Sequence, residues 1–312
     1  MYDIELRYVA NYSVTAFHAA THGLMHREFI DPHVADSLQG NISELRAVLD
    51  SYDESLAQFI KHAPPLAGQI DHNLRLGQVI FRKCSQSEDN ELRDAAFARA
   101  ATALEFAVKS LAPGLLDELE ISAGPLRAKW EVWGPRLLTA FAKQTSPQML
   151  PARADVFLAP PWTGAYSRSY VPYNAVLVEP GAFSMGSNVP QHGNSVPEQI
   201  LSLAWALGQL NTDLPMYADN LSRGGYERVG ALATIPAILT AAESLGGEEC
   251  SAETVAHRVR AWMPECCEDK TAETVWNWWQ TYVHGDATWA VAMIALDRML
   301  YPACRSAATV LS

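Results

Sequence analysis

Three histidines near the N-terminus recur at every fourth position: His18, His22 and His26, within the run FHAATHGLMHRE. In an α-helix, residues four apart lie on the same face, so successive pairs of these side chains point the same way. Two imidazoles at this spacing can chelate a divalent metal such as zinc, copper, nickel or iron. We take His18 and His22 as the candidate metal ligands.

The histidine pair needs further ligands. More than a full helical turn separates His26 from His18, so one metal cannot easily take all three side chains from a straight helix. A third ligand then has to come from another helix, and the candidates are His62, Asp71 and His72. A metal here would make the protein a metal-dependent enzyme. The alternative is a polar helix face whose histidines contact ordinary protein partners.

A second set of notable residues lies between Leu150 and Asn211. Its members are the PxRxD residues Pro151, Arg153 and Asp155, the loop residues Trp162, Gly164, Ala165 and Tyr166, and Glu198 at the start of an apolar helix. This order of strand, aromatic loop, strand and helix resembles that of a zincin-like, gluzincin-type metallopeptidase domain. The resemblance covers about sixty residues, and the helix from Gly224 onward extends it.

The metal-binding motif of such peptidases is absent from this chain. Counted from Glu198, His-Glu-x-x-His would fall on residues 202–206, which read SLAWA. Catalytic zinc needs His or carboxylate ligands and an open position for water. The resemblance therefore implies a zincin-like domain without the peptidase zinc, repurposed to bind a small molecule or a peptide. The alternative is an ordinary buried helix after an ordinary strand.

Four polar residues are the candidate ligand-binding groups of such a domain: Arg153, Tyr166, Glu198 and Tyr226. Arg153 can hold a carboxylate through paired hydrogen bonds, and the tyrosines can orient a ligand. In the competing interpretation, Arg153 and Glu198 pair with each other and have a structural role.

Other catalytic arrangements have weaker support. Serines surround His192, but no Gly-x-Ser-x-Gly elbow is present. The five cysteines are odd in number and include no Cys-x-x-Cys pair, which favours reduced, mostly structural thiols. No glycine-rich phosphate loop or dinucleotide fingerprint occurs.

Composition narrows the class of protein. The chain has 312 residues, 49% of them hydrophobic, which is enough for one large domain or two modest ones. The formal charge of −12 disfavours nucleic acid and anionic membranes as partners. No apolar run reaches the ~18 residues of a membrane span, and the N-terminal MYDIELRY has no signal-peptide pattern. We expect a cytoplasmic protein, with a homo-oligomer possible.

The elements that position these residues are mainly helical. Ala154–Ala159 and Ala175–Glu179 predict strands that pair in a small sheet against a helix at Val196–Leu210, and Asp3–Tyr8 predicts another strand. Helices are expected from Val9 to a stop at Asp31-Pro32, over 42–59, before Pro64-Pro65, and over 66–81, 94–111, 125–143, 224–245 (bent or split at Pro236), 252–262, 272–282 and 288–300.

These elements predict an α+β, mainly α-helical fold. A helical N-terminal region would span 1–146 and a zincin-like region 147–312, with the small sheet near 153–179 and a helical tail; one compact domain is the alternative. Three functions follow: a binding domain without peptidase zinc, a metal-dependent enzyme, or a helical interaction protein without catalysis.

Overall fold

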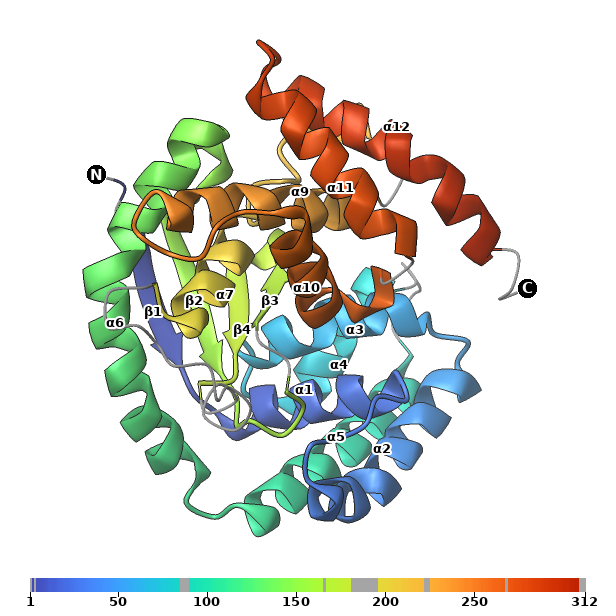
Figure 1. The fold of residues 1–312 in the computed structure, drawn as a ribbon. Helices are drawn as coiled ribbons and strands as arrows, with labels where there is room; N and C mark the ends of the chain where they lie inside the picture. The colour runs from blue at the N-terminus through green and yellow to red at the C-terminus, as the bar shows by residue number, and fades with distance from the viewer. Residues whose placement is uncertain are drawn as a thin grey trace.

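A single mixed sheet lies at the centre of the molecule, and helices cover both of its faces (Figure 1). The computed structural model describes residues 2, 4–84, 90–164, 167–180, 196–221, 225–266 and 269–308. The predicted α+β, mainly helical class is confirmed.

The sheet has four strands in the order β1-β2-β4-β3. Strands β1 (Glu5–Val9), β2 (Arg153–Leu158) and β4 (Ala175–Val178) are parallel to one another. Strand β3 (Ser167–Tyr170) is antiparallel to β4 and occupies the edge. The predicted pairing of the two central segments is confirmed. β3 was not expected, because its residues fall in the stretch interpreted as a loop.

The sheet is buried on both sides, which explains the continuous apolar runs of its central strands. Val156 and Val176 belong to the large core on one face, whereas Phe157 and Leu177 belong to a smaller cluster on the other. Gly68 lets the chain pass close to this smaller cluster, since a Cβ there would lie 2.2 Å from the Phe157 ring.

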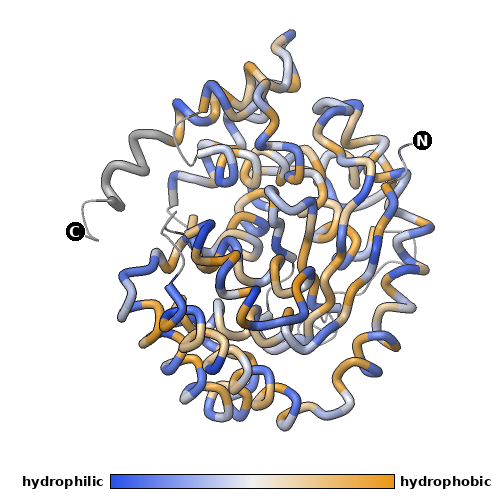
Figure 2. The backbone as a smooth tube through the Cα atoms, turned by 180° about the vertical axis from the view of Figure 1, so that it is seen from behind, coloured by the Kyte–Doolittle hydropathy of each residue, from blue (hydrophilic) through white to orange (hydrophobic). Residues whose placement is uncertain are grey.

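The helices surround the sheet and continue beyond it. Their bounds are α1 (Tyr12–Leu24), α2 (Pro32–Ser51), α3 (Leu56–Ala67), α4 (Asn73–Cys84), α5 (Glu91–Leu111), α6 (Leu115–Gln144), α7 (Glu198–Leu207), α8 (Pro215–Ala218), α9 (Gly225–Glu243), α10 (Ala252–Trp262), α11 (Asp269–Val283) and α12 (Trp289–Ala308). The short 3₁₀ helices η1 (Pro147–Met149), η2 (Val171–Tyr173) and η4 (Pro264–Cys266) lie between them. Figure 2 shows apolar residues concentrated in the central strands, and mixed apolar and polar residues in the outer helices.

Several helix ends differ from the expected ones. The first helix ends at Leu24, and Asp31 instead caps α2 by accepting a hydrogen bond from the His33 N–H. Pro64 and Pro65 lie inside α3, and the break falls after Gly68, so the expected helix 66–81 was wrong.

Proline also fails to divide two other helices. Pro236 does not split α9, and α6 runs from Leu115 through both Pro125 and Pro135. Pro236 is buried in the core, as are the two prolines of α3. Burial of an apolar helix face stabilises the helix by more than the lost backbone bond costs, so tertiary packing outweighs the local preference.

The core joins the two regions expected from the sequence. β1 pairs with β2 from Glu5↔Arg153 to Val9↔Phe157, so the first strand of the N-terminal region belongs to the central sheet. Helix α7 packs on β3 and β4, and α1 and α3 lie on the opposite face. The division at residue 146 stays a prediction. Among the described residues, no helix is long and apolar enough to cross a membrane.

Candidate functional site

A cleft of about 550 Å³ opens beside strand β3. Its walls come from α1, α3, α7, α9 and the α10–η4 segment, which lie far apart in the sequence. Polar side chains from several of these elements converge on this one space. We therefore take it as the candidate site.

The cleft follows the edge of the sheet and not one of its faces. Six consecutive residues, 167–172, line it. Side chains alternate between the two faces of a strand, so a recess over one face would meet only every second residue. Because the cleft contacts every residue of β3 in turn, it runs along the edge of β3 that does not pair with β4.

The register identifies which backbone groups of β3 face the cleft. The Val178 carbonyl accepts a hydrogen bond from the N–H of Ala159, directly after β2, so the main-chain groups of Val178 point to β2 and those of Leu177 point to β3. The partner of Leu177 is Arg168, whose groups therefore point back to β4. Ser167 and Ser169 consequently direct their N–H and C=O groups to the open edge.

Helix α7 forms one wall through hydrogen bonds to β3. The Ser202 hydroxyl donates to the Ser167 hydroxyl oxygen at 2.7 Å, and the Ser169 hydroxyl donates to the Gln209 carboxamide oxygen at 2.7 Å. The indole of Trp205 donates to the Ala231 carbonyl in α9 at 2.9 Å. All five residues from Ser202 to Ala206 are buried, and none can ligate zinc or act as a carboxylate base. A peptidase zinc does not fit this helix.

Behind the opposite wall, directly after β4, lies a buried carboxylate. Glu179 is fully buried, and its Oε1 accepts from the Thr163 backbone N–H at 3.1 Å and from the Thr163 hydroxyl at 2.7 Å. His18 Nε2 lies 2.8 Å from the same oxygen. The other oxygen, Oε2, is buried and has no hydrogen-bond partner among the described residues.

This arrangement determines the tautomer of His18. Oε1 of Glu179 already accepts two hydrogen bonds from Thr163, so the third bond requires a proton on His18 Nε2. The second ring nitrogen, Nδ1, makes none of these bonds. It has no partner among the described residues and is not sealed from solvent, and His18 lines the cleft. His18 therefore offers this nitrogen to the cleft as a polar group.

His22 also uses Nε2 for a protein partner. This nitrogen lies 2.8 Å from the Glu28 carbonyl oxygen, and its ring meets Phe29 edge-on. Burial lowers the pKa of His22 below its ordinary value, although the Glu28 contact opposes the shift. The neutral ring is thus favoured, with its donor directed at the carbonyl.

The other histidine-site candidates lie elsewhere. His26 falls beyond the end of α1, in the left-handed region with φ +54°, so the four-residue repeat does not continue on one helix face. His62 bonds Tyr173 and Gln58, and burial lowers its pKa to about 4. Asp71 and His72 are exposed. No group of three or more His, Cys, Asp or Glu able to hold a metal occurs among the described residues.

The four candidate ligand-binding residues do not meet in the cleft as expected. Arg153 is exposed at the opposite, amino-terminal end of β2. Tyr226 begins α9 and its hydroxyl contacts Lys61 at 3.3 Å, but only its neighbours Glu227 and Arg228 line the cleft. Tyr166 lies outside the described residues. A role for these residues in ligand binding stays a prediction.

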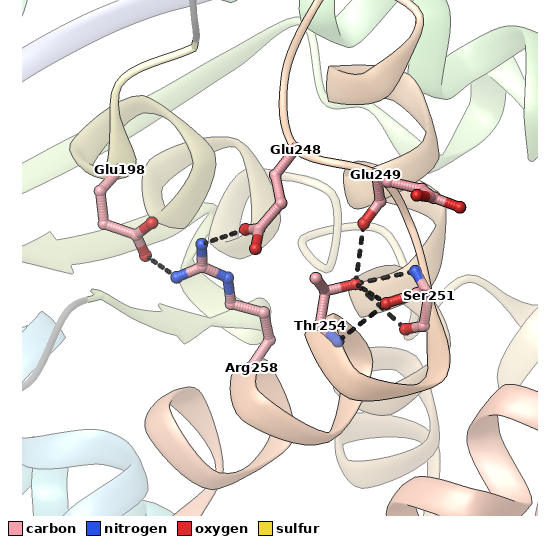
Figure 3. A network of polar contacts seen from close by, with 6 residues as sticks. All are labelled: Glu198, Glu248, Glu249, Ser251, Thr254 and Arg258. Carbon is pink, nitrogen blue, oxygen red and sulfur yellow. Dashed lines mark hydrogen bonds and ion pairs between the residues drawn. The ribbon is translucent and has the colours of Figure 1, made fainter. Parts of the chain in front are cut away.

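Glu198 pairs with Arg258 of α10 and not with Arg153 (Figure 3). The guanidinium Nη1 donates to Glu198 Oε1 at 2.6 Å, while Nη2 reaches Glu248 at 3.5 Å. Burial raises the pKa of Glu198, and Arg258 acts in the opposite direction. This contact joins the start of α7 to α10, so a structural role for Glu198 is sufficient to explain its position.

Two of the described thiols, Cys84 and Cys250, do not support nucleophilic catalysis. Burial raises the pKa of Cys84 to about 12 and that of Cys250 to about 11. Both therefore stay protonated at neutral pH, and a protonated thiol is a poor nucleophile.

Sequence reasoning missed the two features that define the cleft. The edge strand β3 is short and polar, so its pattern does not stand out. Glu179 did carry a signal, because it is the first charged residue after the apolar run AVLV. It therefore lies at the carboxyl end of a predicted strand, and ligands often bind at the carboxyl ends of parallel strands. Comparison with protein-family models, curated proteins and solved structures finds no significant match to this chain.

Proposed function

We propose that this protein binds an extended peptide segment, which adds to the sheet along the open edge of β3. The observation that carries the proposal is the cleft's contact with all four residues of β3 and with the two residues that follow them. Ser167 and Ser169 direct main-chain donors and acceptors into this space. An added strand would pair with them, and main-chain pairing is a known source of affinity in peptide recognition.

A peptide suits this cleft better than a compact small molecule. The recess borders a strand, and the polar groups that face it repeat at the spacing of alternate residues. The backbone of a second strand matches that spacing whatever its side chains are.

The proposal includes a zincin-like domain without peptidase zinc, in the cytoplasm, as the sequence suggests. Its support is the order of β2, β4 and α7, with α7 packed against the sheet where the resemblance puts the metal-binding helix. The positions that would carry the zinc ligands hold Ser202 and Ala206 instead. No peptidase chemistry is assigned to this site.

The test compares two substitutions at one residue. Ser169→Pro removes the outward N–H, which proline can do at an edge strand without breaking the ladder to β4. Ser169→Ala keeps that N–H and removes only the hydroxyl contact to Gln209. Binding of a library of capped, fluorescently labelled octapeptides is followed by fluorescence anisotropy. Thermal unfolding checks that both variants fold.

The expected result is loss of binding in Ser169→Pro and near-normal binding in Ser169→Ala. Equal binding by both variants would show that peptides do not use the edge of β3. Failure of the entire library to bind the wild-type protein would reject the proposed function.

A metal-dependent enzyme is the second candidate. The observation in its favour is that His18 and His22 each anchor Nε2 on a protein acceptor, which is how second-shell groups orient metal ligands through the other nitrogen. Elemental analysis of protein purified without a histidine tag tests it. Stoichiometric metal that is lost in His22→Ala would support this candidate, and absence of metal from the wild-type protein would reject it.

A further inference from the structure

The two walls of the cleft differ in chemistry, and the difference bears on which peptide the cleft takes. A strand added to β3 would direct alternate side chains to opposite faces of the sheet. One set would meet the α7 side and the other set the side of α1 and α3. The argument below rests on the proposed function, since it asks which side chains an added strand carries.

The α7 side contains an apolar, aromatic patch. Ser167 and Ser169 turn their side chains to this face, where they bond α7. Trp205 and Trp262 line the cleft here, with ring centroids 4.9 Å apart, and Met263 adjoins them. Side chains of a bound peptide that point this way would meet rings and methylene groups, which favours apolar residues at those positions.

The other side is cationic. Arg168 lies between Ser167 and Ser169 in β3, so its side chain points to the opposite face of the sheet. There its guanidinium lies 5.6 Å from the centre of the Tyr170 ring. Lys61 from α3 and Arg27 beyond α1 also line the cleft. Their positive charges favour acidic side chains of a bound peptide on this wall, whereas the aromatic wall favours apolar ones.

The acids near these cations are already paired. Glu227 Oε1 lies 2.6 Å from Lys61 Nζ, and Glu265 Oε2 lies 3.0 Å from Arg27 Nη2. The ion pair with Glu227 and the contact with Tyr226 raise the pKa of Lys61 despite the opposing effect of burial, so the ammonium stays charged.

Arg168 differs from these cations because no described carboxylate lies within ion-pair distance of it. The lining residues include four Lys or Arg and two Glu, a formal charge of 4 − 2 = +2, and the buried Glu179 directly behind His18 and Thr163 reduces it to +1, in a chain whose formal charge is −12. A local charge of opposite sign to the whole molecule is a feature of the cleft itself.

We propose that the cleft selects an extended segment in which apolar and acidic residues alternate. The apolar residues would lie against Trp205 and Trp262, and a carboxylate on the alternate side would pair with Arg168. An arginine–carboxylate contact is charge-assisted and geometrically specific. Complementary charge also suppresses the wrong partner, since a basic segment would meet like charge in the cleft.

Three capped octapeptides test the proposal, each made of four repeats: Val-Glu, Val-Gln or Val-Lys. We expect the Val-Glu peptide to bind about tenfold more tightly than the Val-Gln peptide, and the Val-Lys peptide to bind least, at low ionic strength. Added salt should reduce these differences. The negative net charge of the whole chain alone predicts the opposite order of affinities, with Val-Lys binding most tightly. The measured order therefore shows whether the charge of the cleft or that of the whole chain determines binding.

Two matched variants complete the test. Arg168→Gln should reduce the preference for Val-Glu over Val-Gln to less than about twofold while leaving Val-Gln binding unchanged. Arg46→Gln, which removes the same charge from an exposed position on α2, should leave the preference intact. Equal binding of the three peptides to the wild-type protein, or an unchanged preference in Arg168→Gln, would overturn the acidic selectivity and leave edge binding in place. No binding of any peptide would remove both.

Discussion

The two edges of the central sheet differ in what lies beside them. At the β1 edge, helix α6 lies alongside the strand (Figure 1): the Tyr2 N–H donates to the Thr139 hydroxyl at 2.9 Å, and the Arg127 guanidinium lies 4.7 Å from the centre of the Tyr8 ring. At the β3 edge, the strand borders an open cleft. Unprotected edges invite pairing with other chains, and proteins usually shield them.

The contrast indicates that the open edge has a use. β3 has only four residues, and the cleft has walls on both faces of the sheet. We expect such walls to admit one extended strand and to obstruct the edge of another folded sheet. The exposed pairing groups are thus compatible with a protein that does not aggregate through them.

The first way to sharpen the comparison is to remove the carboxylate beside the open edge. Glu179→Ala leaves the buried His18 Nε2–H and the Thr163 donors without their acceptor. We expect a loss of about 3 kcal/mol in the free energy of unfolding, because breaking a buried hydrogen-bonded pair is costly. Urea denaturation measures the loss. A change below about 1 kcal/mol would show that the cluster is not important for stability.

The second test uses pH and His62, which bonds Tyr173 just beyond β3. Its folded-state pKa of about 4 lies below the ordinary value of 6.5, so between these values the unfolded chain binds a proton that the folded chain does not. Stability from this residue is complete above pH 6.5 and falls toward pH 4. We expect about 2 kcal/mol of this loss between pH 6.5 and 4.5.

The matched variant is His62→Gln, which has no titrating ring. Its urea unfolding curves at pH 7.0, 5.5 and 4.5 should show a smaller acid loss than those of the wild-type protein. Parallel losses in the two proteins would assign the acid sensitivity to other groups.

The third test places a proline at each edge. Glu5 donates its N–H to Ala152 next to β2, so the alternate residue Leu6 directs its N–H outward. Leu6→Pro is therefore the counterpart of Ser169→Pro. We expect Ser169→Pro to weaken peptide binding at least about tenfold and Leu6→Pro to leave it within about twofold. Equal losses in anisotropy titrations would contradict the difference between the edges.

The smallest effect is expected at the closed edge, where Arg7 pairs with Asp155 across β1 and β2. The two side chains form a bidentate contact at 2.7–2.8 Å, but Arg7 is 67% exposed. Asp155→Asn should cost less than about 1 kcal/mol in urea denaturation, because solvent screens exposed pairs. It should not alter peptide affinity, and an altered affinity would mean that the two edges are coupled.

The sequence by itself determined the class of fold and its central pairing. The apolar runs of β2 and β4 and the apolar helix after them are local patterns with the periods of strand and helix, and they were interpreted correctly. The loss of zinc ligands at residues 202–206 was equally readable, since it depends only on residue types.

Only the tertiary structure determined which side chains meet at the candidate site. His18 meets Glu179 across 161 positions of sequence, and Glu198 takes Arg258, 60 positions away, in place of Arg153. Local periodicity carries no information about such pairs, because many charged residues are chemically equivalent partners until the chain packs. The same holds for β3, whose short polar pattern becomes a strand only because β4 supplies its hydrogen bonds.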